Sequence, residues 1–333
     1  SMIGADDLAR DIKDSSINSK ICFIGSHISA LPREVMLNKN VDFVLINEGV
    51  YGLINLLKTN LKDNLEKCPG LGFRQNNEIF INEGKLVPNE KMHIDLPGYN
   101  WDLLPKKNKT LDLYRAHFWH SYFSEKDRYT FAAPYSSLGC AFACNFCMIN
   151  IVNRTSTEDN VDASNFKGMR YWKPDFFLDE LEKLSDIGVK TLRLSDEMFF
   201  LNRKHYVPIL EGIIERKLDF NIWAYARVDT VREDMLELFK KAGVNWLALG
   251  IEAGNQNVRL SIEKGRFKDV NIRSVVELIK KYDIYILGNY IVGFPEDNHE
   301  SMNATLDLAI ELNTEFANFY PCQALPGSPL FTE

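Results

Sequence analysis

Half of the six cysteines in this chain lie close together in one short loop. Cys140, Cys144 and Cys147 stand in the segment SLGCAFACNFCMIN, residues 137–150. Spacings of four and three residues allow three thiolates to reach one compact iron–sulfur cube. Three ligands leave one iron without a protein donor, and an open metal position can bind a substrate or cofactor. The loop therefore predicts an iron–sulfur site with one vacancy.

Two other interpretations of these cysteines remain open. The first is a structural zinc ion, with His117 or His120 as the fourth ligand. It is less favoured because zinc motifs usually consist of two close pairs of ligands. The second is that the three cysteines are buried as small hydrophobic residues with no ligand role.

Composition limits the classes of partner. The chain has 333 residues, of which 45% are hydrophobic and 26% charged, and its formal net charge is −7. No basic patch is dense enough to neutralise a row of phosphates, so we expect a small-molecule substrate rather than nucleic acid or a membrane surface. We find no apolar run near the roughly 20 residues that cross a bilayer and no signal-peptide layout. We therefore expect a cytoplasmic protein with reduced thiols, in which clustered cysteines bind metal.

From about residue 130, the chain repeats a unit of amphipathic helix, short break and buried strand. Gly188 and Gly243 stand where two of the helices should end in a left-handed residue. Six segments read as strands: residues 129–138, 191–195, 220–226, 245–251, 284–292 and 316–320. Alternation of strands with helices predicts an α/β fold with a parallel sheet, here a partial (β/α)6 TIM-like barrel. Cys140 follows the first strand, at the barrel mouth where such folds assemble their sites.

The N-terminal part has another pattern. Residues 1–90 contain the pattern of a strand, a turn and a helix two times in succession. This pattern indicates a partial open α/β segment of Rossmann type. Residues 91–129 show little periodicity, and we interpret them as a linker with some packed aromatic residues; the aromatic residues of HFWHSYF, 117–123, could instead line a cofactor face. The predicted domains are therefore 1–90, 91–129 and 130–333.

The cysteine loop resembles the CxxxCxxC loop of the radical S-adenosylmethionine enzymes, with the aromatic Phe146 directly before the third cysteine. The resemblance covers about residues 130–330. It implies that Cys140, Cys144 and Cys147 hold a 4Fe–4S cluster. It also implies that the open iron binds the amino and carboxylate groups of S-adenosylmethionine.

The acidic pair Asp196 and Glu197 follows the second predicted barrel strand. The family resemblance implies that these residues accept hydrogen bonds from the ammonium group of the cofactor. Two carboxylates beside an apolar strand are costly to bury without a cationic or hydrogen-bonded partner, so a ligand amine explains them. The alternative is an acidic residue at a helix N-terminus, favoured by the helix dipole.

Tyr225 and Arg227 end the third predicted barrel strand. The resemblance implies that both lie at the cofactor, and Arg227 could bind the methionine carboxylate through a two-bond fork. A surface ion pair between Arg227 and Asp229 is the competing interpretation.

Two later strand ends complete the predicted cofactor site. Glu252 and Gly254 resemble the segment of the family that binds the ribose, where a carboxylate can accept from both hydroxyls. Gly293 and Pro295 resemble the stretch after the fifth strand that lets backbone approach the adenine.

The N-terminal segment has a second resemblance, to the later half of the cobalamin-binding domain that precedes many radical enzymes of this type. The matching positions lie at two strand ends: Gly25, Ser26, His27, Glu48 and Gly49. The resemblance implies that Gly25, Ser26 and His27 lie where a glycine-rich turn passes the nucleotide tail of the cofactor, and that Glu48 and Gly49 lie at the next strand end.

The match departs from the family pattern at several points. Ser26 and Val50 stand where the family has a second glycine and a second acidic residue, and no D-x-H-x-x-G segment occurs, so a lower axial histidine is absent. His27 reads more often as a turn or surface histidine than as a ligand.

The resemblance implies that a flavodoxin- or ferredoxin-like donor supplies one electron to the cluster. That electron cleaves S-adenosylmethionine and releases a 5′-deoxyadenosyl radical. The radical then removes hydrogen from an unactivated carbon. With cobalamin present, we expect methyl transfer to that carbon. Without it, we expect rearrangement, ring closure or oxidation. A non-catalytic iron–sulfur electron-transfer protein is a further alternative.

Overall fold

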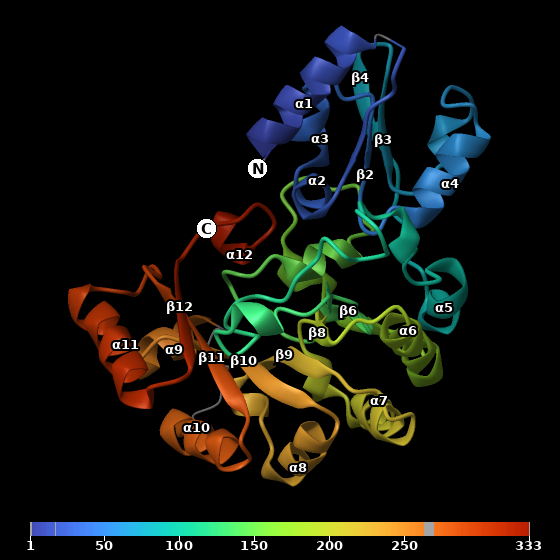
Figure 1. Cartoon of the computed structure of the whole chain (residues 1–333). Coiled ribbons are helices and arrows are strands. Elements are labelled where there is room, and N and C mark those ends of the chain that lie inside the picture. Colours follow the sequence, from blue (N-terminus) through green and yellow to red (C-terminus); the bar gives the residue numbers. More distant parts are fainter. Residues whose placement is uncertain (1, 17, 263–269, 333) are drawn as a thin grey trace. The chain divides into compact units, whose positions relative to one another are not determined.

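The computed structural model describes residues 2–16, 18–262 and 270–332 (Figure 1). The chain divides into two compact units. The N-terminal unit contains the chain up to Lys91, Gly139–Met169 and the segment from Gln323, whereas the barrel unit contains Met92–Leu138 and Arg170–Cys322. The predicted domain boundaries at residues 90 and 130 remain a prediction. In the division into compact units, the cysteine loop belongs with the N-terminal residues. Within the described ranges, no helix is long and apolar enough to span a bilayer.

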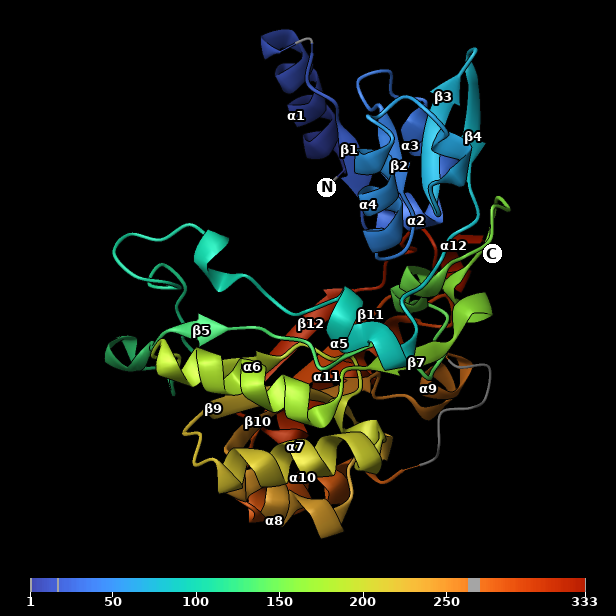
Figure 2. The ribbon, with the colours of Figure 1, turned by 90° about the vertical axis from the view of Figure 1, so that its right-hand side faces the viewer.

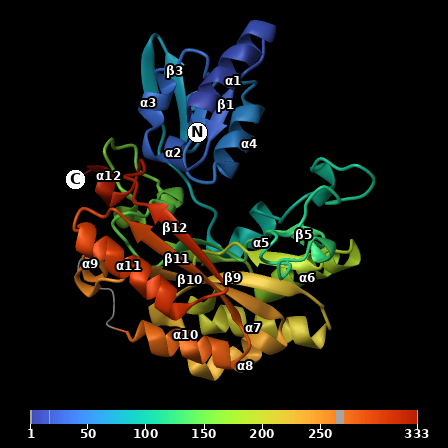
Figure 3. The ribbon, with the colours of Figure 1, turned by 60° about the vertical axis from the view of Figure 1, so that its left-hand side comes forward.

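The barrel unit is built on one six-stranded sheet, in which every strand pair is parallel. The strand order is β12-β11-β10-β9-β8-β5, and Figure 3 shows β9 to β12 side by side. The predicted parallel α/β sheet of a partial barrel is confirmed. The strands are β5 (Phe131–Ala132), β8 (Thr191–Leu194), β9 (Asn221–Arg227), β10 (Val244–Glu252), β11 (Tyr285–Val292) and β12 (Phe316–Pro321).

The first predicted strand, 129–138, is not one strand. β5 ends at Ala132, and a second strand, β6 (Ser137–Cys140), pairs with β7 (Gly168–Tyr171) in a separate two-stranded sheet. Pro134 stands between β5 and β6. Proline has no N–H to donate to a strand ladder, so the interruption falls where the sequence contains it.

Helices cover one face of the barrel sheet. Side chains alternate along a strand, so Ile222, Ala224 and Ala226 of β9 point to this outer face and pack with helix residues such as Leu181 and Leu236. Gly188 and Gly243, with φ of 88° and 86°, follow two of these helices as predicted. The helices of the unit are α5 (Met92–Asp95), α6 (Pro174–Asp186), α7 (Arg203–Glu215), α8 (Glu233–Lys241), α9 (Gln256–Ile262), α10 (Ile272–Lys281) and α11 (His299–Leu312).

Aromatic side chains fill the inner face of the sheet near its N-terminal end. The ring of Trp119 lies 5.3 Å from that of Trp223 and 5.1 Å from that of Trp246. His120 is fully buried beside them, and its carbonyl accepts from the side chain of Asn221, the first residue of β9. The prediction that some aromatic residues of segment 91–129 are packed is confirmed for Trp119, whereas Phe118, Tyr122 and Phe123 are exposed.

The N-terminal unit holds a four-stranded sheet of order β1-β2-β3-β4. β1 and β2 are parallel, whereas β3 pairs antiparallel with both β2 and β4. The two predicted strand–helix pairs are present, and Figure 2 shows the strands with α2 to α4 around them. The elements are α1 (Met2–Ser15), β1 (Cys22–Ile24), α2 (Ser26–Ala30), α3 (Pro32–Met36), β2 (Phe43–Leu45), α4 (Val50–Lys58), β3 (Leu71–Gln75) and β4 (Glu78–Ile81).

The hairpin of β3 and β4 was not predicted. Asn76 and Asn77 form its two-residue turn, with φ of 51° and 65°. Two residues of positive φ give a turn whose twist matches that of the strands, and asparagine tolerates this conformation. The Asn-Asn pair between alternating apolar residues was the signal.

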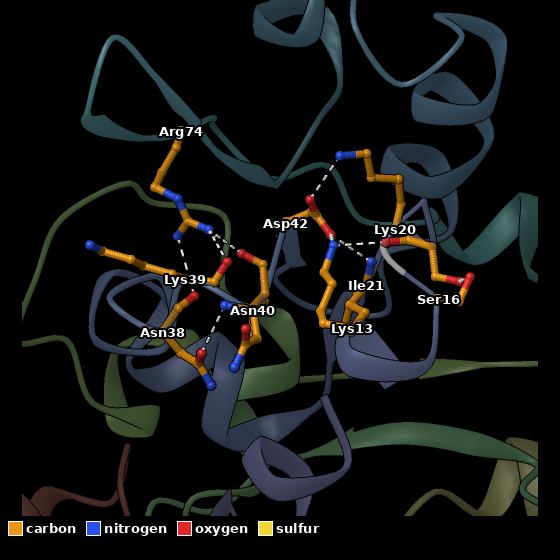
Figure 4. A network of polar contacts seen from close by, with 11 residues as sticks. Lys13, Ser16, Lys20, Ile21, Asn38, Lys39, Asn40, Asp42 and Arg74 are labelled. Atoms are coloured by element: carbon orange, nitrogen blue, oxygen red, sulfur yellow. Dashed lines mark hydrogen bonds and ion pairs between the residues drawn. The ribbon is translucent and has the colours of Figure 1, made fainter. Parts of the chain in front are cut away.

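Polar contacts join the N-terminal elements, as Figure 4 shows. The Asp42 carboxylate binds Lys13 at 2.6 Å, Lys20 at 3.0 Å and the amide of Ile21 at 2.9 Å. Burial alone would raise the pKa of Asp42, but these three donors outweigh it and lower the pKa. The guanidinium of Arg74 donates to carbonyls at the end of α3 and in the turn that follows it.

The rest of the N-terminal unit follows the cysteine loop. It contains two 3-10 helices, η5 (Ile149–Asn153) and η6 (Ala163–Phe166), and the short helix α12 (Pro329–Thr332). Ile151 of η5 is fully buried in a cluster with Ala30 of α2 and with Val161 and Ala163. This cluster packs the loop that follows the cysteines against the N-terminal α/β segment.

Candidate functional site

The cysteine loop begins where β6 ends, at Cys140. Gly139 precedes it with a φ of 85°, and a Cβ there would lie 2.2 Å from the carbonyl oxygen of Gly168. Only glycine combines this conformation with so close an approach. The glycine that leads the cysteine loop is therefore required by the packing of β6 on β7.

Asn150 holds the loop in shape. Its Oδ1 accepts from the amide of Cys140 at 2.7 Å, and its Nδ2 donates to the carbonyl of Phe142 at 2.9 Å. The amide of Phe142 donates to Sγ of Cys140 at 3.5 Å. Hydrogen bonds to sulfur are one means by which proteins set the potential of an iron–sulfur cluster. Asn150 was not predicted, because a side chain that bridges its own loop leaves no spacing pattern.

The three thiols suit a cluster better than a single ion. Cys140 is buried, and Cys144 and Cys147 are partly exposed. Among the residues that the structure describes, no three His, Cys, Asp or Glu side chains are grouped to hold one metal ion, so the zinc alternative gains no support. In an iron–sulfur cube each thiolate binds a different iron, so the sulfurs need not converge on one point. Asn145, between Cys144 and Phe146, also carries a buried Oδ1 that accepts no hydrogen bond from the part of the chain that the structure describes.

His120 is poorly placed for the zinc alternative. It is fully buried among the indole rings at the N-terminal end of the sheet. Burial lowers its pKa to about 3, so the ring is neutral at physiological pH. His117 stacks on Trp119 in the same aromatic region, with ring centroids 5.7 Å apart.

Asp196 lies just past β8 and is fully buried. Its carboxylate accepts from the amide of Ser136 at 3.1 Å and from the hydroxyls of Ser136 at 2.8 Å and Ser137 at 2.5 Å. Burial raises the pKa of Asp196, and the donors from Ser137 and Ser136 oppose that effect. The partners that the carboxylate needs are thus supplied by the strand that leads to Cys140, and not by a helix N-terminus.

His205 completes this group. Its Nε2 lies 2.9 Å from Oγ of Ser136, and its ring lies 4.7 Å from that of Tyr171. Burial lowers the pKa of His205 to about 4, so it stays neutral. Ser136, Ser137 and His205 were all missed from the sequence, since the serines bind Asp196 from a distant segment and His205 contacts Ser136 from another.

Glu197 lies beside Asp196 but is only half-buried. Burial raises its pKa, the positive charge of Arg193 acts against that effect, and the neighbouring Asp196 adds to it. Arg193 donates to the hydroxyl of Tyr225 at 2.9 Å, and its guanidinium lies 5.0 Å from the ring centre of Trp223. Arg193 was also missed, although a lone arginine in the apolar strand TLRL signals a side chain on the inner face.

Arg227 pairs with Asp229. Its Nε and Nη2 donate to the two carboxylate oxygens at 2.9 and 2.8 Å, and the side chains are only 10% and 6% exposed. The pairing that competed with a cofactor role is therefore confirmed, but the prediction that it lies at the surface is wrong. Two charges so deeply buried need each other, because either alone would carry a large desolvation penalty.

Glu252 ends β10 in a left-handed conformation, with φ of 65°. A non-glycine residue seldom adopts this conformation, and such residues are frequent at functional sites. The register of β10 shifts at this point, and a Cβ on Gly250 would lie 2.8 Å from Oε1 of Glu252. The strained turn therefore brings the carboxylate back over Gly250, which stands at an inner-face position of the strand.

The two predicted glycines of the cofactor site differ in role. At Gly254 a Cβ would lie 2.2 Å from the carbonyl of Ala304, so packing against α11 requires glycine there. Gly293 has a φ of 85°, and a Cβ there would meet nothing within 4 Å, which leaves room for a ligand. Its amide and that of Phe294 donate to Asp297 at 2.9 and 3.1 Å, and Pro295 is exposed.

The residues predicted to bind cobalamin lie at the carboxyl ends of the parallel strands β1 and β2, where open α/β sheets bind ligands. Gly25 has a φ of 133°, and a Cβ there would meet no atom of the described residues within 4 Å. A cavity of about 570 Å³ lies in the N-terminal unit beside this turn. It is lined mainly by apolar side chains, among them Phe23, Ile28 and Met148, and by His27.

Glu48 and Gly49 have structural roles at the end of β2. The Glu48 carboxylate accepts from the amide of Val87 at 2.7 Å. Gly49 has a φ of 63°, and a Cβ there would lie 2.6 Å from the side chain of Ile24. Its conformation and the tight packing both require glycine.

Comparison with known proteins gives relatives along nearly the whole chain. An uncharacterized methyltransferase of Pyrococcus horikoshii is 26% identical, and the alignment covers 99% of this chain and 66% of that protein. The anaerobic magnesium-protoporphyrin IX monomethyl ester cyclase of Cereibacter sphaeroides is also 26% identical, over 93% of this chain and 47% of the cyclase. The chain thus spans about half to two thirds of the length of these relatives.

The fold also matches a solved structure. The radical S-adenosylmethionine methyltransferase TsrM of Kitasatospora setae, determined with cobalamin and a [4Fe-4S] cluster bound, superposes with a TM-score of 0.75 at 17% identity over 98% of this chain and 61% of TsrM. A model of the Radical SAM superfamily matches residues 135–309, more than half of the chain and the region of the cysteine loop and barrel strands. The chain therefore belongs to the Radical SAM superfamily, whose members use a 4Fe–4S cluster and S-adenosylmethionine.

Proposed function

We propose that this chain is the catalytic part of a cobalamin-dependent radical S-adenosylmethionine methyltransferase that acts on an unactivated carbon of a small molecule. An external one-electron donor of flavodoxin or ferredoxin type supplies the reducing electron. The observation that carries the proposal is the cavity in the N-terminal unit. It is bounded on one side by His27, in the predicted cobalamin turn, and on another by Met148, which directly follows the third cysteine.

The residues around this cavity fit a corrinoid. Its lining is mainly apolar, which suits the face of a broad macrocycle. Gly25 leaves open space at the carboxyl end of β1, where a polar tail could pass close to the backbone. His27 is one of the lining residues, and the family pattern gives it no axial role.

The cysteine loop fits the iron–sulfur cluster. Cys140, Cys144 and Cys147 supply three thiolates, and Asn150 fixes the backbone at both ends of the first turn. When bound, the cluster supplies the electron that cleaves the sulfonium of S-adenosylmethionine. The buried Oδ1 of Asn145 would accept a hydrogen bond from a group bound at this loop.

The inner face of the barrel sheet supplies the remaining roles. Glu197, partly exposed and beside the buried Asp196, accepts from the cofactor ammonium. Glu252 presents its carboxylate to the ribose, and the open backbone at Gly293 faces the adenine. Tyr225 and Arg193 flank this site, and Arg227 acts through its pair with Asp229.

The aromatic residues beneath the site exclude water. Trp119, Trp223 and Trp246 form contacts that close the N-terminal end of the inner face. A primary carbon radical is quenched by nearby hydrogen donors, so a dry, closed wall protects the reaction.

The names of relatives support the proposal and also favour one alternative. The Pyrococcus horikoshii relative is named a methyltransferase, whereas the Cereibacter sphaeroides relative is named a cyclase. The second candidate is therefore radical ring closure that follows hydrogen abstraction without cobalamin.

The test uses anaerobically purified protein with a reconstituted cluster, a chemical reductant, S-adenosylmethionine and hydroxocobalamin. We expect S-adenosylhomocysteine only when cobalamin is present, because the sulfonium would transfer its methyl group to cobalamin that the chemical reductant has brought to the Co(I) state. A C140A variant should form none. Formation of 5′-deoxyadenosine without cobalamin binding would overturn the methyl-transfer proposal in favour of the second candidate, and formation of neither product would overturn both.

A further inference from the structure

We infer that Arg154 is a positioning residue that fixes the predicted cobalamin turns to the loop that holds the cluster. The inference rests on the proposed function only for the ligand that these turns bind. All of the residues involved belong to the N-terminal unit. Neither the cysteine motif nor the cobalamin resemblance includes Arg154.

The Arg154 side chain is fully buried and uses its whole guanidinium. Nη1 donates to the carbonyls of Ser29 at 2.7 Å and Ala30 at 3.1 Å, both in α2. Nε donates to the carbonyl of Ser156 at 3.0 Å, and Nη2 donates to the carbonyl of Glu158. These four acceptors are all backbone carbonyls, so Arg154 ties the last turn of α2 to the chain after the cysteine loop.

A second set of bonds closes a ring around Arg154. Its carbonyl accepts from Nδ2 of Asn47 at 3.1 Å, and the amide of Asn47 donates to Oγ of Ser29 at 2.9 Å. Asn47 Oδ1 also accepts from the amide of Gly49 at 2.9 Å. Arg154, Ser29 and Asn47 therefore join the turns that end β1 and β2, and these turns carry the predicted cobalamin residues.

The 3-10 helix η5 connects this ring to the cysteines. Asn150 in η5 binds the amide of Cys140 and the carbonyl of Phe142. Arg154 follows directly after η5, and the amide of Arg154 donates to the carbonyl of Ile151 at 3.0 Å. One short, packed element thus holds the cluster loop through Asn150 and the N-terminal turns through Arg154.

The presence of arginine at position 154 supports a positioning role rather than a role in fold stability alone. A buried guanidinium has a large desolvation cost, and an apolar residue of similar volume often stabilises a fold as well or better. Burial lowers the pKa of Arg154, which reflects that cost. What arginine adds is a rigid planar fork with several donors at set angles, which lysine lacks. Arg154 therefore orders several carbonyls at once.

The experiment compares the wild type with Arg154→Lys, Asn47→Gly and the control Arg10→Lys. Arg154→Lys keeps the charge and loses the fork. Asn47→Gly keeps the positive φ of 54° without strain and loses the side chain. Arg10 lies on the exposed surface of α1 and pairs with acidic residues of the same helix. For each full-length protein we would measure iron content, hydroxocobalamin affinity and amide hydrogen exchange with and without the reconstituted cluster.

We expect cluster loading to slow exchange at residues 26–31 and 47–49 in the wild type and in Arg10→Lys. In Arg154→Lys and Asn47→Gly, the slowing should stay within residues 140–154, iron content should be retained, and hydroxocobalamin should bind at least tenfold more weakly. The inference is overturned if loading the wild type leaves residues 26–31 unchanged. It is also overturned if Arg154→Lys keeps the wild-type exchange response or, where the wild type binds hydroxocobalamin, the wild-type affinity for it.

A wild type that shows the exchange response but binds no hydroxocobalamin would separate the two ideas. The positioning role of Arg154 would stand, and the cobalamin part of the proposed function would fail. The exchange measurement needs no substrate and no turnover.

Discussion

The guanidinium of Arg227 donates two hydrogen bonds to the carboxylate of Asp229, with N–O distances of 2.9 and 2.8 Å. Both side chains are nearly buried. Arg227→Ala should lower the free energy of unfolding by about 3–5 kcal/mol, because it leaves the Asp229 charge buried without its partner. Arg232→Ala is the matched control, since Arg232 is 70% exposed, and we expect a change within about 0.5 kcal/mol. Denaturant unfolding measures both. A stable Arg227→Ala protein with weakened S-adenosylmethionine binding would show instead that Arg227 contacts the cofactor.

Asp196→Asn tests whether Asp196 is a structural anchor. Both serine hydroxyls and the Ser136 amide donate to Oδ1, and the same amide also donates to Oδ2, so either orientation of an asparagine amide points N–H groups at a donor. We expect a loss of about 2–3 kcal/mol in the free energy of unfolding and a thermal midpoint below that of the exposed control Asp186→Asn. If unfolding is unchanged while S-adenosylmethionine affinity falls, the carboxylate serves the cofactor directly.

Glu197→Gln should weaken S-adenosylmethionine binding at least tenfold, because a hydrogen bond between ions is about twice as strong as a neutral one. Equilibrium dialysis of reconstituted protein measures the affinity, and Glu211→Gln, on the exposed face of α7, is the control.

The same site predicts a pH dependence. Burial raises the pKa of Glu197 above its usual 4.5. The proposed role requires the ionised form of Glu197 to bind the ammonium, so wild-type affinity for S-adenosylmethionine should fall as pH decreases through that raised pKa. Glu197→Gln should show no such step. An identical pH profile in both proteins would contradict the role of Glu197.

Iron content should distinguish the three proposed cluster ligands from the other three cysteines. Alanine at Cys140, Cys144 or Cys147 should remove most of the iron and the visible absorption of the cluster, since each thiolate holds its own iron. Alanine at the other three cysteines, Cys22, Cys68 and Cys322, should leave iron content unchanged. Iron and sulfide analysis after anaerobic reconstitution decides this. Retention of the cluster in any of the first three variants would exclude that residue as a ligand.

Asp42 should make the N-terminal unit acid-sensitive. Burial acts to raise its pKa, but Lys13, the amide of Ile21 and Lys20 together lower that pKa, so the ionised form stabilises the fold. That stabilisation is complete above the ordinary pKa of 3.8 and is lost as pH falls through the lower folded value. Asp42→Asn should cost roughly 1 kcal/mol at neutral pH, after allowance for solvent screening. The difference from wild type should vanish in strong acid. Asp63→Asn, exposed, should match the wild type throughout.

Local patterns in the sequence determined much of the fold and the type of site. The cysteine spacing, the alternation of apolar residues in strands such as β9, and the glycines at 188 and 243 act over a few residues, so each could be interpreted without the rest of the chain. The hairpin turn at Asn76 and Asn77 was equally local, although it was overlooked.

Only the tertiary structure decided which side chains the site residues bind. Asp196 accepts from Ser136, 60 residues away, and Arg154 donates to Ser29, 125 residues away. Neither partner stands at a spacing that a helix or strand imposes. The sequence placed Asp196 and Arg227 at strand ends, but it did not show that serine donors hold the Asp196 carboxylate or that the Arg227–Asp229 pair is buried. Hydrogen bonds between distant segments depend on how the elements pack, and packing is a property of the whole folded chain.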